Sequence, residues 1–157
     1  MKFSSQEEYG LRCLVAIALK GEQGSITIPE LGRAEGLSAS HVGKLLSLLR
    51  RAGFIKSVRG QLGGYSLGKD PAEILVRDVL ETLGGRLYGE GFCERHSGLL
   101  PVCVHEADCL LRPLWSRVQR AVDSSIEGLT IADILQHRLG ETVKLSQMPA
   151  ERSPNLP

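Results

Sequence analysis

Apolar residues recur every three or four positions in several stretches of the 157-residue chain, and this spacing predicts helices that each bury one face. These stretches are residues 7–20, 29–35, 38–52 and 76–83. Residues 54–67 instead alternate apolar and polar positions around a glycine-rich break, which predicts a β-hairpin. The pattern therefore predicts three helices, a hairpin and a further short helix, in that order.

Capping residues mark the boundaries of the second and third predicted helices. Thr27 and Glu30 stand at capping-box spacing before the second helix, and Gly36 is suited to end it. Ser38 is a good N-cap for the third helix. Two helices separated by about three residues around a glycine are the signature of a helix-turn-helix. Because a hairpin follows at once, the predicted unit is a winged helix-turn-helix.

The most regular apolar spacing lies in the C-terminal half, from residue 107 to residue 127. It predicts the longest helix of the chain, and Pro113 fits best if the regular helix begins near it. A stripe of this length indicates either a core contact on two sides or the seam of a dimer. Thr130 with Asp133 predicts a capped final turn, whereas residues 140–157 have little periodicity and three prolines, which is typical of a disordered tail.

Charge divides the chain into two parts, although the formal net charge is only +1. Residues 1–69 carry ten Lys and Arg against five Asp and Glu, whereas the remainder carries nine against thirteen. A basic N-terminal part indicates a module that faces a polyanion. No stretch approaches the roughly 20 apolar residues of a membrane span, and residues 1–10 lack the apolar core of a secretory signal. We therefore expect a cytoplasmic protein with no membrane partner.

A helix-turn-helix lays its second helix in the major groove of double-stranded DNA, while flanking cations hold phosphates. The start of that helix offers polar side chains, and the hairpin tip joins an arginine suited to a narrow minor groove to glycines that permit close approach. The predicted DNA contacts are Ser38, Ser40, His41, Lys44, Arg50, Arg51, Arg59, Gly60, Gln61, Gly63, Gly64 and Tyr65. Two alternatives stay open: the unit binds another protein, or Arg50 and Arg51 are simply solvated surface.

Three of the four cysteines lie within seventeen residues of a segment expected to be loop-like until about Ala107. They are Cys93, Cys103 and Cys109, separated by nine and five residues. In a reducing cytosol, clustered thiols favour metal or redox chemistry over disulfides. An iron-sulfur cluster, a thiol redox sensor, zinc and a structural role are all open, although zinc sites usually have cysteines two to four residues apart. Cys13, on the first apolar stripe, is expected to be a small buried hydrophobe.

A cluster needs a fourth ligand besides the three thiolates. The candidates are His96, His105, Glu94, Glu106 or a carboxylate delivered by a partner subunit. A cysteine with His96 or His105 could also form a nucleophile and base, but the sequence offers no third group to orient them and no phosphate-binding loop. We therefore expect no enzymatic activity.

Four pieces of sequence carry a wider resemblance. They are the start "MKFSSQEEYGLRCLVAIAL", the segment "LSASHVGKLLSLLRRAGFI", the segment "SVRGQLGGYSLGKD", and a three-cysteine stretch leading into "CLLRPLW". Over some 135 positions the chain resembles the IscR/NsrR (Rrf-type) family of bacterial transcription regulators. The resemblance implies a mainly α fold with a small β-hairpin wing and a long C-terminal dimerisation helix. It also implies a homodimer that binds a palindromic operator, expected to act as a repressor, and an iron-sulfur cluster that senses redox, nitric oxide or iron-sulfur status.

The resemblance further implies one cluster per subunit, 2Fe-2S or 4Fe-4S, with Cys93, Cys103 and Cys109 as ligands. Some members add a histidine three residues after the last cysteine, where this chain has Arg112. Others add an acidic residue at the start of the first helix, a position that Glu8 occupies here, so the resemblance implies Glu8, contributed across the dimer, as the fourth ligand. Two features depart from the family pattern: the longer first interval between cysteines, and Gly43 in place of a side chain that reads bases in some relatives.

The longer interval favours a metal-free alternative on the same fold, in which the same three cysteines form a thiol redox switch or the loop docks another protein. In both interpretations the domain division is the same. Residues 1–69 form the winged helix-turn-helix DNA-binding domain, 70–106 the connecting helix and cysteine-bearing cluster loop, 107–139 the dimerisation helix and C-terminal turn, and 140–157 the tail.

Overall fold

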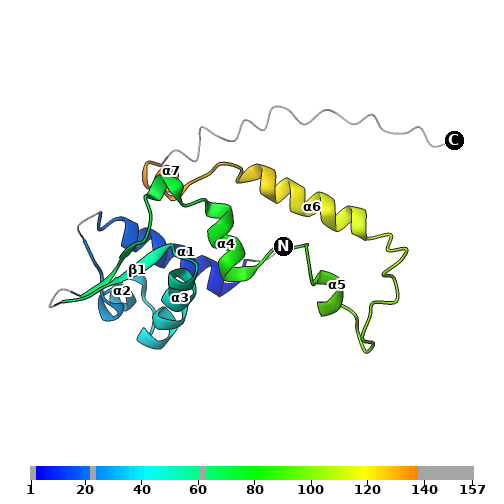
Figure 1. Ribbon diagram of the computed structural model, residues 1–157, viewed down its shortest axis with the longest axis horizontal. Coiled ribbons are helices and arrows are strands. Elements are labelled where there is room, and N and C mark those ends of the chain that lie inside the picture. The colour runs from blue at the N-terminus through cyan, green and yellow to red at the C-terminus, as the bar shows by residue number, and fades with distance from the viewer. Residues whose placement is uncertain (1–2, 22–23, 61–62, 138–157) are drawn as a thin grey trace.

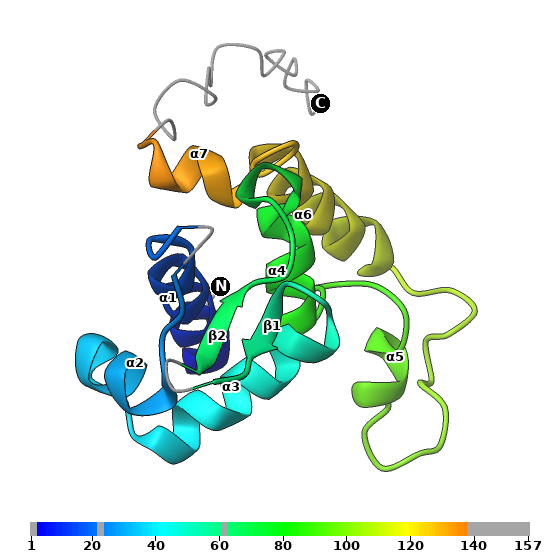
Figure 2. The ribbon, with the colours of Figure 1, turned by 60° about the vertical axis from the view of Figure 1, so that its left-hand side comes forward.

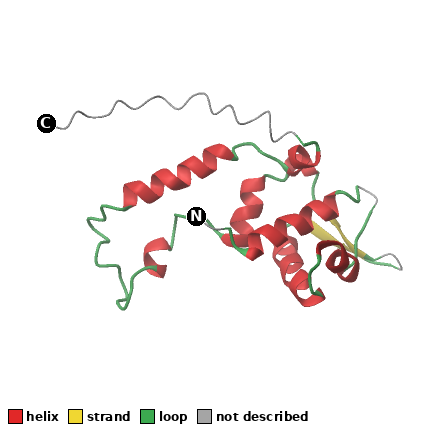
Figure 3. Cartoon of the chain, turned by 180° about the vertical axis from the view of Figure 1, so that it is seen from behind, coloured by secondary structure: helices red, strands yellow, loops and turns green. Residues whose placement is uncertain are grey.

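The computed structural model of the protein describes residues 3–21, 24–60 and 63–137. Its first part holds helices α1 (Ser5–Ala18), α2 (Ile28–Glu35) and α3 (Ala39–Arg51), then strands β1 (Ile55–Val58) and β2 (Gly64–Leu67) (Figure 1). The 3₁₀ turn η1 (Pro71–Glu73), α4 (Val76–Gly84), α5 (Phe92–Arg95), α6 (Arg112–Ser125) and α7 (Ile131–Leu135) follow. The predicted mainly helical fold with a β-hairpin wing is confirmed (Figure 3).

Local side-chain caps fix where the helices of the helix-turn-helix begin. At α2 the Thr27 hydroxyl accepts from the Glu30 N–H at 3.4 Å, while the Glu30 carboxylate accepts from the Thr27 N–H at 2.8 Å. Ser38 caps α3 by accepting from a first-turn N–H at 3.2 Å, and α7 has the predicted capping box at Thr130. Gly36 ends α2 at φ +69°, a left-handed conformation suited to glycine. The predicted boundaries of these helices are confirmed.

Helix α1 begins and ends two residues earlier than its apolar stripe predicts. Ser4 is the N-cap, and Glu7 completes a capping box by accepting from the Ser4 N–H at 2.8 Å. The apolar stripe marks the buried face of a helix, whereas the N-cap residue marks where the helix begins. The signal for the true start was therefore the Ser4–Glu7 spacing rather than the first apolar residue.

The hydrophobic core lies where α1, α3 and α4 meet the hairpin (Figure 2). Its fully buried side chains include Leu14, Ile17, Leu31, Leu45, Leu46, Leu49, Val79 and Leu83. Full burial of one such side chain stabilises the fold by about 1.5–3 kcal/mol. Cys13 belongs to the same cluster with 0% exposure, which confirms its predicted role as a small buried hydrophobe.

The wing is anchored to the segment that precedes α2. Ile55 pairs with Leu67 in the hairpin, and Ile26 adds a bridge to Tyr65 through N–H···O bonds of 3.0 and 2.9 Å. A Cβ atom on Gly64 would lie 2.6 Å from the Ile26 carbonyl oxygen. Only glycine therefore fits at this approach of the two backbones.

The N-terminal part of α6 and the cysteine loop, residues 88–111, extend away from α1–α4 (Figures 1 and 3). Gln119 is the buried side chain of α6 among the described residues. By contrast, large apolar side chains along and just before the helix are exposed: Leu110 at 92%, Leu111 at 55%, Leu114 at 49% and Trp115 at 37%. A single chain thus leaves most of this apolar stripe uncovered.

Three predictions for this region were wrong in detail. The regular helix covers Arg112–Ser125 instead of residues 107–127, and its 14 residues equal the length of α1, so it is not the longest. It begins beside Pro113 as predicted, because a proline ring clashes with the carbonyl of a preceding helical turn. The cysteine segment also contains a helical turn, α5, which begins after Gly91 in the left-handed region at φ +71°.

Some predictions fall outside the described residues. They concern the disordered tail at residues 140–157 and the DNA contact of Gln61. Among the helices that the structure does describe, none is long and apolar enough to cross a membrane.

Candidate DNA-binding surface and cysteine loop

The start of α3 presents the predicted base-reading residues at the surface. Ser38, Ser40 and Lys44 are exposed and, with Gln6 of α1, line a shallow depression beside the first turns of α3. His41 is half-buried at the same place. The helix therefore offers hydroxyl and ammonium groups at the end that a helix-turn-helix directs to base edges.

The His41 ring is held against α1. It meets the Tyr9 ring edge to face, with centroids 5.6 Å apart and an interplanar angle of 80°. The Arg12 guanidinium lies 5.5 Å from the same Tyr9 ring and donates to the Glu35 carboxylate at 2.8 Å. Aromatic and cationic contacts thus tie the start of α3 to α1 and the end of α2.

Cations on α3 and the wing are not neutralised by neighbouring carboxylates. Lys44, Arg50, Arg51 and Arg59 are exposed, and within the described part of the chain none of them forms an ion pair. Their charge is available to phosphate groups, which supply most of the sequence-independent affinity of DNA-binding proteins.

The turn of the wing and the start of β2 make different contacts. Gly60 has φ +121°, a conformation that favours glycine, and its carbonyl accepts from the Gly63 N–H at 2.9 Å. Gly64 and Tyr65 begin β2 directly after this turn, where they contact Ile26. The structure therefore gives Gly64 and Tyr65 a packing role, while their predicted DNA contacts stay predictions.

The three loop cysteines are free thiols with partial exposure. Cys93 lies on α5, and the other two lie in the irregular segment before α6. Each begins a tight turn: the carbonyls of Cys93, Cys103 and Cys109 accept from the N–H three residues later at 3.2, 3.1 and 3.3 Å. Single backbone hydrogen bonds of this kind leave the loop easy to rearrange.

The side chains of the cysteine loop are of the kind that bind iron-sulfur clusters, although in this conformation they are not grouped around one point. Thiolates are the preferred ligands of iron-sulfur clusters, and the loop offers three. Across the described residues, no three His, Cys, Asp or Glu side chains are grouped so as to hold a metal ion. His96 is engaged, because its Nδ1 lies 2.7 Å from the Phe92 carbonyl oxygen and its ring stacks on Phe92 at 4.2 Å.

Arg112 lies three residues after the last loop cysteine, at the position where the family resemblance implies a histidine ligand in some members. Its guanidinium donates to the Glu106 carbonyl oxygen at 2.5 Å, so it braces the turn between Cys103 and α6. A permanently charged guanidinium has no lone pair to offer a metal. The residue that follows the last cysteine by three positions therefore supports the loop and does not act as a ligand.

Glu8 stands exposed on α1 beside an apolar groove lined by Leu11, Val15, Leu19 and Ile134. Its neighbour Glu7 is committed to the capping box of α1. The Glu8 carboxylate makes no hydrogen bond or ion pair in the described ranges. It is therefore available to a group from outside its own chain.

Two groups have shifted pKa values with clear causes. Burial, together with the nearby Glu35 charge, raises the pKa of the Cys13 thiol to about 11. Hydrogen bonds from Thr27 lower the pKa of Glu30, which keeps the α2 capping box ionised.

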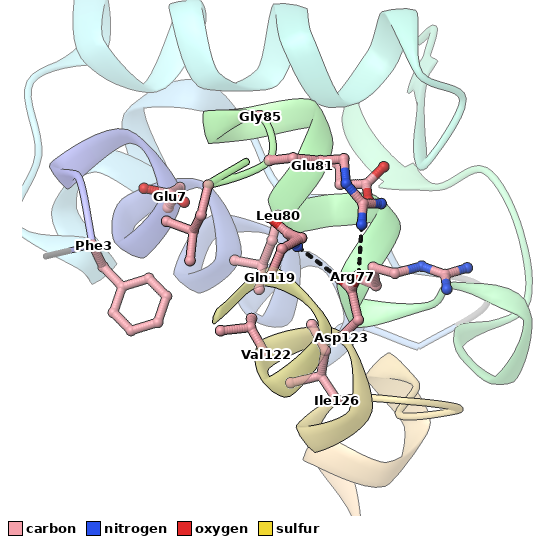
Figure 4. Close-up of a pocket in the computed structure, with 12 residues that line it drawn as sticks. Phe3, Glu7, Arg77, Leu80, Glu81, Gly85, Gln119, Val122, Asp123 and Ile126 are labelled. Carbon is pink, nitrogen blue, oxygen red and sulfur yellow. Dashed lines mark hydrogen bonds and ion pairs between the residues drawn. The ribbon is translucent and has the colours of Figure 1, made fainter. Parts of the chain in front are cut away.

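A polar network between α4 and α6 was not found from the sequence (Figure 4). The figure shows Leu80 and Glu81 of α4 on one side of a small cavity, with Gln119 and Asp123 of α6 and Ile126, which follows the helix, on the other. Arg86 donates to both carboxylates of this set, to Glu81 at 2.6 Å and to Asp123 at 2.5 Å. The available signal was a glutamine within the apolar stripe of residues 107–127, where a buried polar side chain needs partners.

A helix-turn-helix with a wing, and unpaired cations on both, define a winged-helix DNA-binding protein. The family model of Rrf2, described as an iron-dependent transcriptional regulator, matches residues 3–137. The chain belongs to the Rrf2 family, which confirms the resemblance carried by its sequence motifs.

Named relatives support this membership. The chain is 32% identical over 142 residues to the HTH-type transcriptional regulator CymR of Bacillus subtilis, covering 90% of this chain and 94% of that protein. It is 29% identical over 135 residues to the HTH-type transcriptional regulator IscR of Aliivibrio salmonicida, covering 86% and 77%. The crystal structure of the oxidized form of Staphylococcus aureus CymR matches with a TM-score of 0.64 and 29% identity, covering 85% and 95%. These names are those of regulators, in agreement with the expectation that the protein is not an enzyme.

Proposed function

We propose that this Rrf2-family transcriptional regulator binds a palindromic operator as a homodimer, and that the chemical state of its cysteine loop sets its operator affinity. In the form we favour, the sensing group is an iron-sulfur cluster, and the protein acts as a repressor in the cytoplasm. The observation that carries the proposal is a loop with three free, partly exposed thiols joined directly to a winged-helix unit.

DNA binding is supported by the position and charge of α3 and the wing. The exposed start of α3 carries the groups that reach base edges, while Lys44, Arg50, Arg51 and Arg59 supply unpaired positive charge for phosphates. In a helix-turn-helix dimer the half-sites lie about one helical turn, roughly 34 Å, apart. Small changes in the distance between the two winged helix-turn-helix units of the dimer therefore change operator affinity.

A homodimer is supported by the uncovered apolar side chains around α6. Leu111, Leu114 and Trp115 are exposed in the single chain although they follow a helical stripe. Apolar surface of this kind is stabilised by burial against another chain. A second copy offers the same stripe, which gives the self-complementary contact of a two-fold dimer.

The cluster would be held by Cys93, Cys103 and Cys109 together with Glu8 of the partner subunit. When bound, a cluster supplies a centre that reacts with oxygen or nitric oxide. The chain's own contributions are three thiols on a loop of easily broken turns and a carboxylate with no partner within its described surroundings. Binding such a group would order the loop and link the two subunits, which shifts the population of dimer geometries.

The second candidate is a metal-free thiol redox switch that uses the same three cysteines. Its support is the longer interval between Cys93 and Cys103, together with similarity to a CymR protein crystallised in an oxidized form. Here a reversible disulfide within the loop, or between subunits, would replace the cluster.

Purification without oxygen from iron-replete cells separates these candidates. Under the cluster proposal we expect iron and acid-labile sulfide in the dimer, with a loss of both in Cys103→Ser and in Glu8→Ala. Cys13→Ala and Glu94→Ala are the matched controls and should keep them. Protein that contains no iron but forms a reversible disulfide with peroxide would favour the thiol switch, and protein that does neither would contradict both forms of sensing.

A further inference from the structure

A continuous set of polar contacts joins the start of the cysteine loop to α6 and α4. The Tyr88 N–H donates to Gln119 Oε1 at 2.9 Å, and Gln119 Nε2 donates to Asp123 Oδ1 at 2.8 Å. The other oxygen of Asp123 accepts from Arg86 at 2.5 Å, and Arg86 also donates to Glu81 Oε1 at 2.6 Å. The set therefore runs from the loop backbone through α6 to α4.

Gln119 is the residue on which this network depends. Its side chain is 8% exposed, and both ends of its amide are used, one as acceptor and one as donor. A buried amide has lost its hydration, so its hydrogen bonds have to be formed within the protein. Gln119 therefore fixes one arrangement of the loop against α6 and disfavours others.

The loop segment held by Gln119 leads directly into the first cysteine. The Tyr88 ring meets the Phe92 ring at 4.9 Å, and Phe92 lies 6.3 Å from the Trp115 ring of α6. Cys93 follows Phe92 in α5. The placement of Cys93 is thus tied to the contact between Tyr88 and α6.

The other end of the network leads to the DNA-binding part. Leu83 of α4 packs against Gly10 of α1, and its carbonyl oxygen accepts from the Gln6 side chain. Helix α4 also contacts α3, and Gln6 lines the depression beside Lys44 at the start of α3. A displacement of α4 therefore reaches the recognition helix through side chains in contact.

We propose that Gln119 and Arg86 are positioning residues that couple the cysteine loop to α3. They hold Tyr88 against α6 and α6 against α4, so that a change in the loop at Cys93 alters how α4 supports the DNA-reading helix. This inference rests on the proposed sensing function and adds the residues that transmit the signal. Hydrogen bonds and ion pairs are either formed or broken, which suits a coupling between two discrete states.

The test uses the full chain and compares Gln119→Leu and Asp123→Asn with the control Asp78→Asn. Asp78 pairs with its neighbour Arg77 on α4 itself at 3.5 Å, so its loss breaks no contact between elements. Affinity is measured on a duplex that the wild-type protein enriches from a random-sequence library, before and after hydrogen peroxide. We expect the two affinities to differ by about fivefold or more in the wild type and in Asp78→Asn, and by less than about twofold in the network variants.

A second readout requires neither DNA nor a loaded cluster. Amide hydrogen exchange of residues 86–93 should be faster in Gln119→Leu than in the wild type, and unchanged in Asp78→Asn. Asp123→Asn preserves the shape of the side chain, so the test stands even if Gln119→Leu is unstable. If the network variants keep the wild-type ratio of DNA affinities before and after hydrogen peroxide, the coupling is overturned. If that ratio is one in the wild type, the sensing function itself is overturned.

Discussion

At the scale of single residues, the cysteines share one chemistry but differ in their surroundings. Cys13 is fully buried with a pKa raised to about 11, whereas Cys93, Cys103 and Cys109 are partly exposed. The thiolate is the form that reacts with alkylating reagents. In native, metal-free protein at about pH 8, we expect iodoacetamide to label the three partly exposed loop cysteines and to spare the buried Cys13, as read by peptide mass spectrometry.

The pH dependence of this pattern has a definite sign. A raised pKa in the folded state means that Cys13 stabilises the fold fully below its unfolded pKa, and that this contribution is lost as pH rises toward about 11. Labelling of Cys13 should therefore increase only as the fold opens in alkali. Labelling of Cys13 at the same rate as Cys103 at about pH 8 would show that Cys13 is not buried in the native protein.

Tyr9 is expected to affect DNA binding without touching DNA. Its ring holds His41 at the start of α3, and aromatic pairs of this kind contribute about 0.5–1.5 kcal/mol. Tyr9→Leu should therefore weaken operator binding by about two- to tenfold, whereas Tyr9→Phe should retain most of the affinity. Fluorescence anisotropy on a duplex that the wild-type protein enriches from a random-sequence library gives the affinities of both variants. Equal affinities for the two variants would show that the ring has no such role.

Some residue roles could be predicted from the sequence because they depend on neighbours along the chain. The caps at Ser38 and at Thr27 with Glu30, and the burial of Cys13, are of this kind. The contact between Tyr88 and Gln119 spans 31 positions, so no local pattern predicts it. The spacing of residues along the sequence therefore does not identify the polar network between Tyr88, α6 and α4.

At the scale of elements, two glycines inside helices give a matched comparison. A Cβ atom on Gly10 of α1 would lie 2.5 Å from the buried Leu83 side chain, whereas on Gly43 of α3 its nearest neighbour would be 4.0 Å away. Overpacking costs about 1–3 kcal/mol, and alanine gains up to about 1 kcal/mol over glycine in a helix. We expect Gly10→Ala to lower the free energy of unfolding by about 1–2 kcal/mol and Gly43→Ala to raise it by about 0.5–1 kcal/mol.

Chemical denaturation of the two variants measures these differences. A stabilised Gly10→Ala variant would show that α1 and α4 are not in close contact. Because α4 carries Glu81 of the polar network, that result would also weaken the proposed coupling between the loop and α3.

The elements themselves were predictable where apolar spacing and caps agree, as in α2, α3 and the hairpin. The limits of α6 were less so, because the apolar stripe of residues 107–127 continues beyond the regular helix at both ends. The turn α5 was missed, since its four residues are held by Phe92 packing against the rings of Tyr88 and His96. Tertiary contacts of this kind leave no periodic signal.

At the scale of the whole molecule, the exposed stripe of α6 is the feature that a single chain does not explain. We expect Leu114→Glu, which places a charge on that stripe, to shift the protein from dimer to monomer in sedimentation or light-scattering measurements. Operator affinity should fall with it, because a monomer reads one half-site. Ser124→Glu introduces the same charge at an exposed position of α6 and should leave the dimer intact. If neither variant dissociates, the subunit contact lies elsewhere.

The fold and family could be predicted from the sequence, whereas the proposed fourth ligand and the proposed subunit arrangement both involve a second chain. Among the described residues of one chain, the Glu8 carboxylate has no hydrogen-bond or ion-pair partner. No three His, Cys, Asp or Glu side chains are grouped there so as to hold a metal ion. A ligand set shared between subunits cannot be derived from one subunit's spacing. The identity of Glu8 as a ligand therefore stays a prediction that rests on family resemblance.

The central claim is that chemistry at Cys93, Cys103 and Cys109 controls DNA binding. It is tested most directly by measuring the operator affinity of protein purified without oxygen, before and after exposure to hydrogen peroxide, in the wild type and in Cys103→Ser. We expect a change of about fivefold or more in the wild type, within the usual range of allosteric coupling, and none in Cys103→Ser. A wild-type protein with one and the same affinity in both states would contradict it.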